Sequence, residues 1–255
     1  MKKKVLLIGA NGRVGNGFRE EYLKNSEYQK SYELILGVHN KKFKDKNLKT
    51  RYVSIDNLSS LKSALKGIDV VINLAANADP EAKFKNLINP NLIGAYNVFE
   101  AAVKASCPRV IFASSIHAIG GYGHGRKVKE RDVPKPIDLY GATKVFGEAL
   151  CYTFFSKYGL SCIAIRIGAY TSNNKMRNVC FSRHDYDHVI SQRDMGQLLH
   201  KCIIAPKEVK YAILSGTSKN SKLDMDLRLA KKLVGYKPED NSYKICKEIK
   251  TTGLK

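Results

Sequence analysis

The chain of 255 residues, with 44% hydrophobic residues, is long enough to bury a sizeable core, and its charged residues, 26% of the total, are scattered among apolar runs. This composition excludes long disordered segments. The formal net charge of +21 favours anionic partners, but no arginine-rich arm or nucleic-acid motif accompanies the lysines, so a nucleic-acid partner is not expected. We expect a single domain over residues 1–255.

The N-terminal residues predict a first strand and not a targeting segment. An apolar run follows the lysines at 2–4, but it stops after about six residues at Asn11-Gly12-Arg13. No later stretch approaches the roughly 20 apolar residues that a membrane-spanning helix needs. We therefore expect a cytoplasmic protein without a membrane partner.

The six cysteines lie far apart and form no CxxC pair, so neither a zinc site nor a disulfide framework is expected. His184-Asp185 lacks a third ligand at metal-binding spacing, and we assign no metal. Most cysteines are expected to be buried thiols, and they stand at Cys107, Cys151, Cys162, Cys180, Cys202 and Cys246.

Short apolar runs, partly β-branched, alternate with segments that have helical spacing of apolar residues, which predicts repeated βα units. The predicted strands are 5–8, 34–38, 52–55, 70–74, 110–113, 162–165 and 211–214, and the predicted helices are 14–23, 58–65, 92–105, 139–157 and 193–204. Strands that are apolar on both faces belong in a parallel sheet with helices on each side. The expected fold is a doubly wound α/β fold.

Polar segments between these elements predict loops and a cap. Residues 120–136 are rich in glycine and proline, and residues 168–187 have weak periodicity, so both are expected to be loops over a site. Asp138, just before the helix at 139–157, is a candidate N-cap. Residues 168–190 and 215–255 are expected to form a small substrate-binding part at the C-terminal side of the domain.

A glycine fingerprint, G-x-x-G-x-x-G, follows the first strand and opens a helix. Glycines there permit a tight turn and close approach of the backbone to a pyrophosphate, and the helix N-terminus offers N–H donors. This placement indicates a Rossmann-type dinucleotide site and not a plain strand-to-helix turn. The candidate cofactor residues of the fingerprint are Gly9, Asn11, Gly12, Arg13, Val14 and Gly15.

Further cofactor candidates stand at the carboxyl ends of other strands, where ligands bind in such sheets. Asp56 can bond an adenine or cap a helix, and Asn57 stands next to it. The second strand ends in His39-Asn40 followed by Lys41-Lys42, without the acidic residue that accepts bonds from an adenine ribose, so NADP(H) is favoured while NAD(H) stays open. The remaining candidates at strand ends are Leu74, Ala75, Ala76 and Ile167.

A catalytic constellation is predicted from Tyr140-Gly-Ala-Thr-Lys144 at the start of a long helix, because i, i+4 spacing puts the phenol and the ammonium on one face. A Y-x-x-x-K occurs often by chance in a chain with 14 tyrosines, but here Ser115 ends the strand at 110–113. We expect the ammonium and a nicotinamide ring to lower the pKa of Tyr140, so that it exchanges a proton with a substrate oxygen held by Ser115.

With fingerprint, Ser115, Tyr140 and Lys144 in this order, the chain resembles the extended short-chain dehydrogenase/reductase superfamily, also called the NAD-dependent epimerase/dehydratase family. The helix beginning Asn91-Leu-Ile-Gly looks like the N-x-x-G-x-x-N helix of that family, whose first asparagine lies near the active site. The resemblance implies that Asn91, Tyr140 and Lys144 also contact the cofactor, and that Lys144 binds the nicotinamide ribose. It further implies a homodimer through the helices at 92–105 and 139–157.

Segments 112–120, 166–168, 181–185 and 235–238 look most like the uronate dehydrogenase branch of that family. The resemblance implies hydride transfer with a small sugar-like substrate. Several positions where that branch has polar substrate ligands are replaced here, while a histidine remains, so the exact sugar is left open. The candidate substrate residues are Ala78, Ser115, Ile116, His117, Ala169, Lys175 and Arg177.

Two of those residues, Lys175 and Arg177, are the candidates for binding a substrate carboxylate. Lysine stands where the branch has an arginine, and a point charge grips a carboxylate less well than the two parallel bonds of a guanidinium. Two other functions stay open. One is a sugar epimerase, which uses the same tyrosine, and the other is a non-catalytic dinucleotide sensor or nucleic-acid-associated relative, which would fit the charge of +21.

Overall fold

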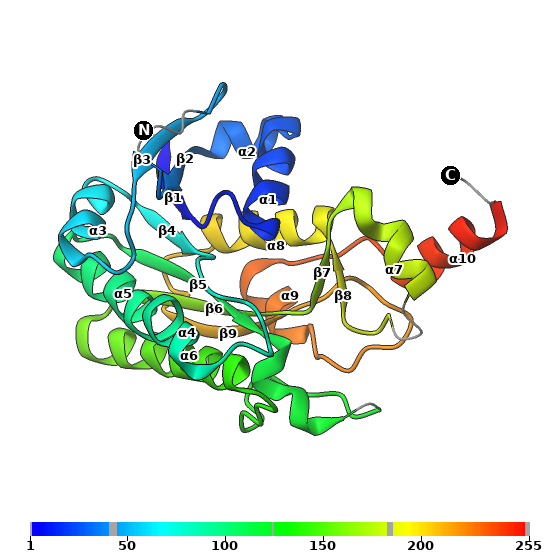
Figure 1. The fold of residues 1–255 in the computed structure, drawn as a ribbon. Coiled ribbons are helices and arrows are strands. Elements are labelled where there is room, and N and C mark those ends of the chain that lie inside the picture. Colours follow the sequence, from blue (N-terminus) through cyan, green and yellow to red (C-terminus); the bar gives the residue numbers. More distant parts are fainter. Residues whose placement is uncertain (1, 41–44, 124, 183–185, 253–255) are drawn as a thin grey trace.

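The computed structural model describes residues 2–40, 45–123, 125–182 and 186–252. Its centre is a seven-stranded sheet in the order β3-β2-β1-β4-β5-β6-β9, and every neighbouring pair is parallel (Figure 1). The strands are β1 (Lys3–Ile8), β2 (Tyr32–Val38), β3 (Lys49–Tyr52), β4 (Val70–Asn73), β5 (Arg109–Ser115), β6 (Ser161–Ile167) and β9 (Tyr211–Gly216). The predicted doubly wound fold is confirmed.

Helices cover both faces of this sheet (Figure 1). One face carries α1 (Arg13–Lys24), α2 (Ser26–Ser31), α8 (Gln192–Ile204) and α9 (Arg228–Val234), and the other carries α3 (Leu58–Leu65), α5 (Gly94–Lys104) and α6 (Leu139–Tyr158). Every residue of β5 and β6 is buried, as expected for central strands apolar on both sides. The short helix α4 (Phe84–Leu87) and a π-helical turn (Ile88–Ile93) lead into α5.

The order of the strands places a crevice at the carboxyl ends of β1 and β4. The chain winds from β1 outward through β2 and β3 and then returns to add β4 on the other side of β1. Loops leaving neighbouring strands in opposite directions open a crevice at this switch point, which is where ligands bind in open parallel sheets. The glycine fingerprint follows β1 at this point.

The third strand lies three residues earlier than predicted. The pairing with β2 involves residues 49–52, whereas the apolar pattern had suggested 52–55. The N–H of Val53 still donates to the Val38 carbonyl, at 2.9 Å, but the chain then leaves the sheet. Val53 and Ile55 line a cavity beside the sheet. Their apolar side chains therefore form part of the cavity wall, although the sequence pattern placed them in the strand.

A small substructure projects from one side of the sheet (Figure 1). It contains the parallel pair β7 (Ala169–Thr171) and β8 (Val189–Ser191), a turn of 3-10 helix (Asn173–Lys175), α7 (Met176–Ser182) and α10 (Ser242–Thr252). The prediction of a loop over 168–187 was therefore wrong for most of this segment. A small apolar cluster packs inside this substructure and consists of Cys180, Tyr186, Val189 and Cys246. The elements that contribute these residues are too short to show a helical or strand periodicity in the sequence.

One cysteine pair departs from the expectation of buried thiols. Cys180 and Cys246 form a disulfide that joins α7 to α10, across 66 residues of sequence. Nothing in their spacing signals the pairing, which depends on two helices meeting in the folded chain. Four cysteines are buried free thiols as predicted, namely Cys107, Cys151, Cys162 and Cys202.

None of the helices within the described ranges is both long and apolar enough to cross a membrane.

Buried His200 on α8 makes the stability of the fold sensitive to acid. Its ring is 1% exposed and stacks on Tyr28 with centroids 4.1 Å apart. Burial lowers the pKa of His200, opposed by the Glu27 carboxylate 3.6 Å away and assisted by Lys201. A lowered folded-state pKa means that the unfolded chain takes up the proton more readily, so stability present above about pH 6.5 is lost as the pH falls through that value.

We therefore expect His200→Phe, which preserves the stack on Tyr28, to weaken this acid sensitivity. The fall in Tm between pH 7.5 and pH 5 should be smaller in the variant than in the wild type. Differential scanning calorimetry at several pH values measures it. Parallel curves for the two proteins would show that His200 does not titrate on unfolding.

Candidate active site

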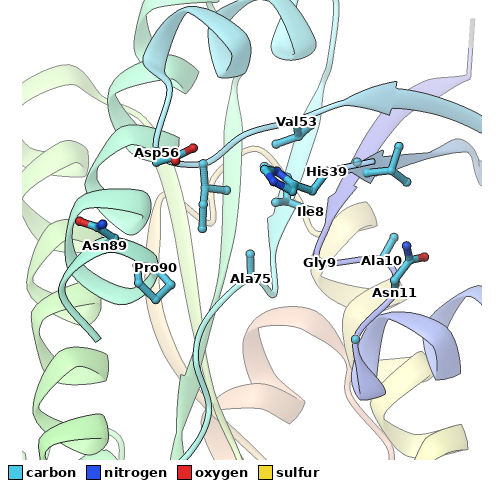
Figure 2. Close-up of a pocket in the computed structure, with 14 residues that line it drawn as sticks. Ile8, Gly9, Ala10, Asn11, His39, Val53, Asp56, Ala75, Asn89 and Pro90 are labelled. Atoms are coloured by element: carbon cyan, nitrogen blue, oxygen red, sulfur yellow. The ribbon is translucent and has the colours of Figure 1, made fainter. Parts of the chain in front are cut away.

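A first cavity lies at the switch point of the sheet (Figure 2). The turn at Gly9 and Asn11 forms one side, and Asn89 with Pro90 forms the opposite side, while Ala75 points in from the end of β4. Apolar side chains of Ile8, Val38, Val53 and Ile55 complete the walls. A cavity with apolar walls of this kind suits an adenine ring.

The glycine fingerprint forms the tight turn that the sequence predicted. Gly9 has φ +81°, and a Cβ there would lie 2.8 Å from the backbone N of Ala75. A Cβ on Gly15 would lie 2.3 Å from the Gly9 carbonyl oxygen, so helix α1 can begin against the turn only because that atom is missing. The N-terminus of α1 therefore faces the cavity with little side-chain bulk in front of it, and this cradle fits the pyrophosphate of a dinucleotide.

His39 and Asp56, two of the candidate cofactor residues, both line this first cavity (Figure 2). The Ser54 hydroxyl donates to the Asp56 carboxylate, and this hydrogen bond holds the pKa of Asp56 below its usual value. Asp56 is thus an ionised acceptor at neutral pH. The neighbouring Asn57 instead caps α3, accepting from the Ser60 N–H at 2.9 Å, and Asn40 does not belong to the lining.

A second, larger cavity adjoins the first, because Gly9 and Gly12 line both. It brings together the three predicted catalytic residues from the end of β5 and the start of α6: Ser115, Tyr140 and Lys144. The predicted cofactor residues Arg13, Val14, Gly15, Leu74, Ala76 and Ile167 line it too. A single elongated ligand can therefore reach from Asp56 to Tyr140.

Burial shifts the pKa values of Tyr140 and Lys144. Burial raises the pKa of Tyr140, and a hydrogen bond with Ser115 opposes that rise. Burial also lowers the pKa of Lys144 to about 8. Lys144 Nζ lies 5.4 Å from the centroid of the Tyr140 ring. The lowering of the Tyr140 pKa was expected with a nicotinamide ring bound, whereas in the protein alone desolvation outweighs the Ser115 hydrogen bond and the pKa is raised.

His117 faces the second cavity and is held by Asp138. Its Nδ1 lies 2.6 Å from Asp138 Oδ2, and its ring meets the Tyr140 ring edge-on with centroids 5.5 Å apart. The other Asp138 oxygen accepts from the Gly141 N–H at 2.6 Å, so the predicted N-cap of α6 is confirmed. The backbone N–H of His117 donates to Ser115 Oγ at 3.2 Å.

The other candidate substrate residues divide into two groups. Ala78, Ile116 and Ala169 line the second cavity together with His117. Lys175 is exposed and does not belong to that lining. The side chain of Arg177 lies outside the described residues, as do Lys41, Lys42, His184 and Asp185.

Asn91 connects two segments of the chain by side-chain hydrogen bonds. Its amide accepts from the Asn77 N–H at 2.8 Å and donates to the Asn77 carbonyl at 2.9 Å and to Thr143 Oγ1 at 3.0 Å. It thereby joins the loop after β4 to the first turn of α6. Asn91 lies in neither cavity lining, although it holds the two segments from which Ala76 and Tyr140 line the second cavity.

Sequence reasoning missed several residues of the second cavity, among them His188, Tyr170, Thr171 and Val179. His188 stands just before β8, and its Nε2 lies 3.6 Å from the Asp224 carboxylate. A loop over 168–187 has no strand register, so the sequence did not show that Tyr170, Thr171 and Val179 face the cavity, and His188 lies just beyond that loop. A short apolar run at Val189-Ile190 directly after His188 was the available signal for a strand.

Comparisons with known proteins agree with this geometry. The family model described as "NAD dependent epimerase/dehydratase family" matches residues 5–207. An NAD-dependent glucose-6-phosphate dehydrogenase from Haloferax volcanii is 29% identical, covering 95% of each chain. A uronate dehydrogenase from Pseudomonas putida is 28% identical, over 94% of this chain and 85% of its own. An L-arabinose 1-dehydrogenase (NAD(P)(+)) from Haloferax volcanii is 30% identical, over 72% of this chain and 79% of its own.

Among solved structures, a mutant of uronate dehydrogenase from Agrobacterium tumefaciens complexed with NAD superimposes with a TM-score of 0.83 at 26% identity. The match covers all of this chain and 91% of that one. These relatives confirm the expectation of a nicotinamide-dependent dehydrogenase of the extended short-chain type. This chain belongs to the NAD dependent epimerase/dehydratase family.

Proposed function

We propose that the protein transfers a hydride between a nicotinamide cofactor and a hydroxyl or carbonyl carbon of a sugar-like molecule. The observation that carries this proposal is the convergence of Ser115, Tyr140 and Lys144 on a cavity continuous with the glycine cradle at Gly9. The sensor alternative gives no reason for a tyrosine and a lysine to be buried beside such a cavity. Several relatives are named for sugars or sugar acids, which supports the substrate class.

In this proposal the residues of the chain share the chemistry as follows. Ser115 orients the substrate oxygen by a hydrogen bond, and Tyr140 accepts the proton of that oxygen when the substrate is oxidised. Lys144 stabilises the phenolate and binds the nicotinamide ribose. The bound dinucleotide supplies the hydride acceptor.

The small-molecule substrate is expected to be less polar than a uronate. The walls contributed by Ala78, Ile116 and Ala169 offer no hydrogen bonds from their side chains to sugar hydroxyls, and leaving such groups unpaired is costly. We propose that residues 168–190 and 215–255 form the substrate-binding part. If the substrate is acidic, Lys175 or Arg177 binds its carboxylate, although Lys175 is exposed and does not line the second cavity.

A substrate panel tests this function. We expect reduction of the cofactor, followed at 340 nm, with neutral aldoses or simple hydroxy compounds, and kcat/KM for glucuronate and galacturonate at least about tenfold lower. Lys175→Ala and Arg177→Ala should lower any uronate activity further and leave neutral substrates unchanged. Efficient uronate oxidation that survives both substitutions would show that the carboxylate is bound elsewhere, and no turnover with any member would count against the enzyme.

We also propose a preference for NADP(H) over NAD(H). The chain leaves β2 through His39 and Asn40, where an acidic residue would repel a 2′-phosphate. Titrating each cofactor against intrinsic tyrosine fluorescence should give a lower Kd for NADP(H), by about threefold to tenfold, that is, up to about 1.4 kcal/mol. His39→Asp should reverse the order. Tighter NAD(H) binding by the wild type would reject this proposal. The relative named as an NAD-dependent glucose-6-phosphate dehydrogenase can be titrated in the same way as a reference.

A homodimer through α5 and α6 and a cytoplasmic location complete the proposal. Large apolar side chains are exposed on and beside these two helices, namely Ile93, Tyr96, Leu139, Phe146 and Tyr152. Burying such a surface against a second copy would stabilise the pair. The four buried free thiols agree with a reducing compartment, whereas the disulfide between α7 and α10 is the feature that argues for an oxidising one.

A further inference from the structure

We propose that Asp138 is a positioning residue that fixes the tautomer of His117, so that His117 accepts a hydrogen bond from a substrate hydroxyl next to the carbon that is oxidised. The proposal rests on the proposed function and adds a specificity device to it. It begins from the 2.6 Å contact between His117 Nδ1 and Asp138 Oδ2. A carboxylate can only accept, so the proton in this contact belongs to Nδ1.

Asp138 is itself held rigidly. Its Oδ1 accepts from the Gly141 N–H at 2.6 Å at the N-terminus of α6, where an acidic group is favoured by the helix dipole. The carboxylate therefore cannot turn away from His117 without uncapping the helix that carries Tyr140 and Lys144. Its side chain is 17% exposed, which leaves little competition from water. A well-placed carboxylate behind a histidine is a usual way to fix ring orientation and tautomer.

The remaining ring nitrogen then decides what His117 recognises. A ring protonated on Nδ1 alone has a lone pair on Nε2, and none of the described residues donates a hydrogen bond to it. The ring lines the second cavity and is 31% exposed. Nε2 can therefore accept from a hydroxyl group but cannot pair with a carbonyl or ether oxygen.

The place of this acceptor points to a hydroxyl close to the reacting carbon. His117 N–H bonds the hydroxyl of Ser115, and the His117 ring meets the Tyr140 ring at 5.5 Å between centroids. Ser115 and Tyr140 bind the oxygen of the carbon that is oxidised. A hydroxyl group on the adjacent carbon of a polyol would then be within reach of His117 Nε2. The preferred substrates are therefore expected to have two neighbouring hydroxyl groups.

The test is a double-mutant cycle on Asp138→Asn and His117→Gln. The Asp138→Asn variant would keep an amide oxygen for the Gly141 N–H, since asparagine is a good N-cap, but would present an NH2 group to His117 Nδ1 and drive the proton to Nε2. We expect KM for the best sugar of the panel to rise about tenfold in Asp138→Asn, with the Kd of the cofactor and Tm nearly unchanged. In the His117→Gln background the same substitution should raise KM less than twofold.

Two further measurements keep the result decisive. A substrate analogue lacking the neighbouring hydroxyl should have the same KM with wild type and with Asp138→Asn. The 15N shifts of the His117 ring near pH 8 should place the proton on Nδ1 in the wild type and on Nε2 in Asp138→Asn, whatever the turnover. Additive effects in the cycle, or a ring proton on Nε2 in the wild type, would overturn the proposal. Absence of turnover with correct ring shifts would instead reject the proposed function.

Discussion

Tyr140→Phe is expected to lower turnover by at least about 100-fold while leaving cofactor affinity within about twofold of the wild type. The substitution removes only the phenolic oxygen, and general acid–base groups of this kind contribute roughly 10² to 10⁴ in rate. The ring remains to fill its buried place beside Lys144. Steady-state kinetics with the best sugar of the panel and a cofactor titration measure the two quantities.

The pH profile adds a check on this assignment. Burial raises the pKa of Tyr140, so the fraction of Tyr140 that is present as the phenolate grows only in the alkaline range. Sugar oxidation needs the phenolate as proton acceptor, and the wild-type rate should therefore increase as the pH rises through that range. The residual activity of Tyr140→Phe should lack that dependence. Tyr152→Phe on the same helix is the matched control, because this tyrosine is 56% exposed. Full activity in Tyr140→Phe would remove the tyrosine from the mechanism.

The sheet and the meeting of Ser115, Tyr140 and Lys144 at one cavity could be predicted from the sequence because each depends on local signals. Buried parallel strands are apolar on both faces, and a fingerprint between a strand and a helix fixes where the crevice must lie. Ser115 at the end of β5 and Tyr140 at the start of α6 then meet, since both stand at the same edge of the sheet. The i, i+4 spacing brings Lys144 onto the same face of α6.

What the sequence could not supply depends on contacts between distant segments. The disulfide between Cys180 and Cys246 requires that α7 and α10 meet, and His188 enters the cavity only through the pairing of β7 with β8. Neither short strand has enough residues to show periodicity. The partner of His117 was missed for another reason. The cap at Asp138 uses one carboxylate oxygen, and a separation of 21 residues gives no sequence signal that the other oxygen contacts His117.

The raised pKa of Tyr140 in the protein alone has a physical cause that the sequence hides. Motif spacing shows that an ammonium is near, but it does not show how much water both groups lose. Tyr140 is 8% exposed and Lys144 4%, so desolvation dominates for each of them. Desolvation raises the pKa of one group and lowers the pKa of the other, and both shifts favour a neutral pair in the protein alone.

The second large effect follows from that desolvation. Lys144→Met is expected to abolish turnover and, at the same time, to raise the Tm of the cofactor-free protein at pH 7 by several degrees. The pKa of Lys144 falls from 10.5 to about 8, which corresponds to an energetic cost on the order of 3 kcal/mol for keeping the buried amine charged. Lys144 Nζ also lies 5.2 Å from the centroid of the Phe112 ring, and losing this favourable contact offsets part of the stability gained when the ammonium is removed.

The pH dependence of that gain gives the sign of the effect. A base with a lowered folded-state pKa destabilises the fold below its unfolded value of 10.5, and the full cost is reached below about pH 8. The difference in Tm between Lys144→Met and wild type should therefore be largest near pH 7 and shrink toward pH 10. Lys157→Met on the exposed end of α6 is the control and should leave Tm unchanged. A lower Tm for Lys144→Met than for the wild type at pH 7 would show that the buried ammonium has stabilising partners. An unchanged cofactor Kd in this variant would show that Lys144 does not bind the ribose.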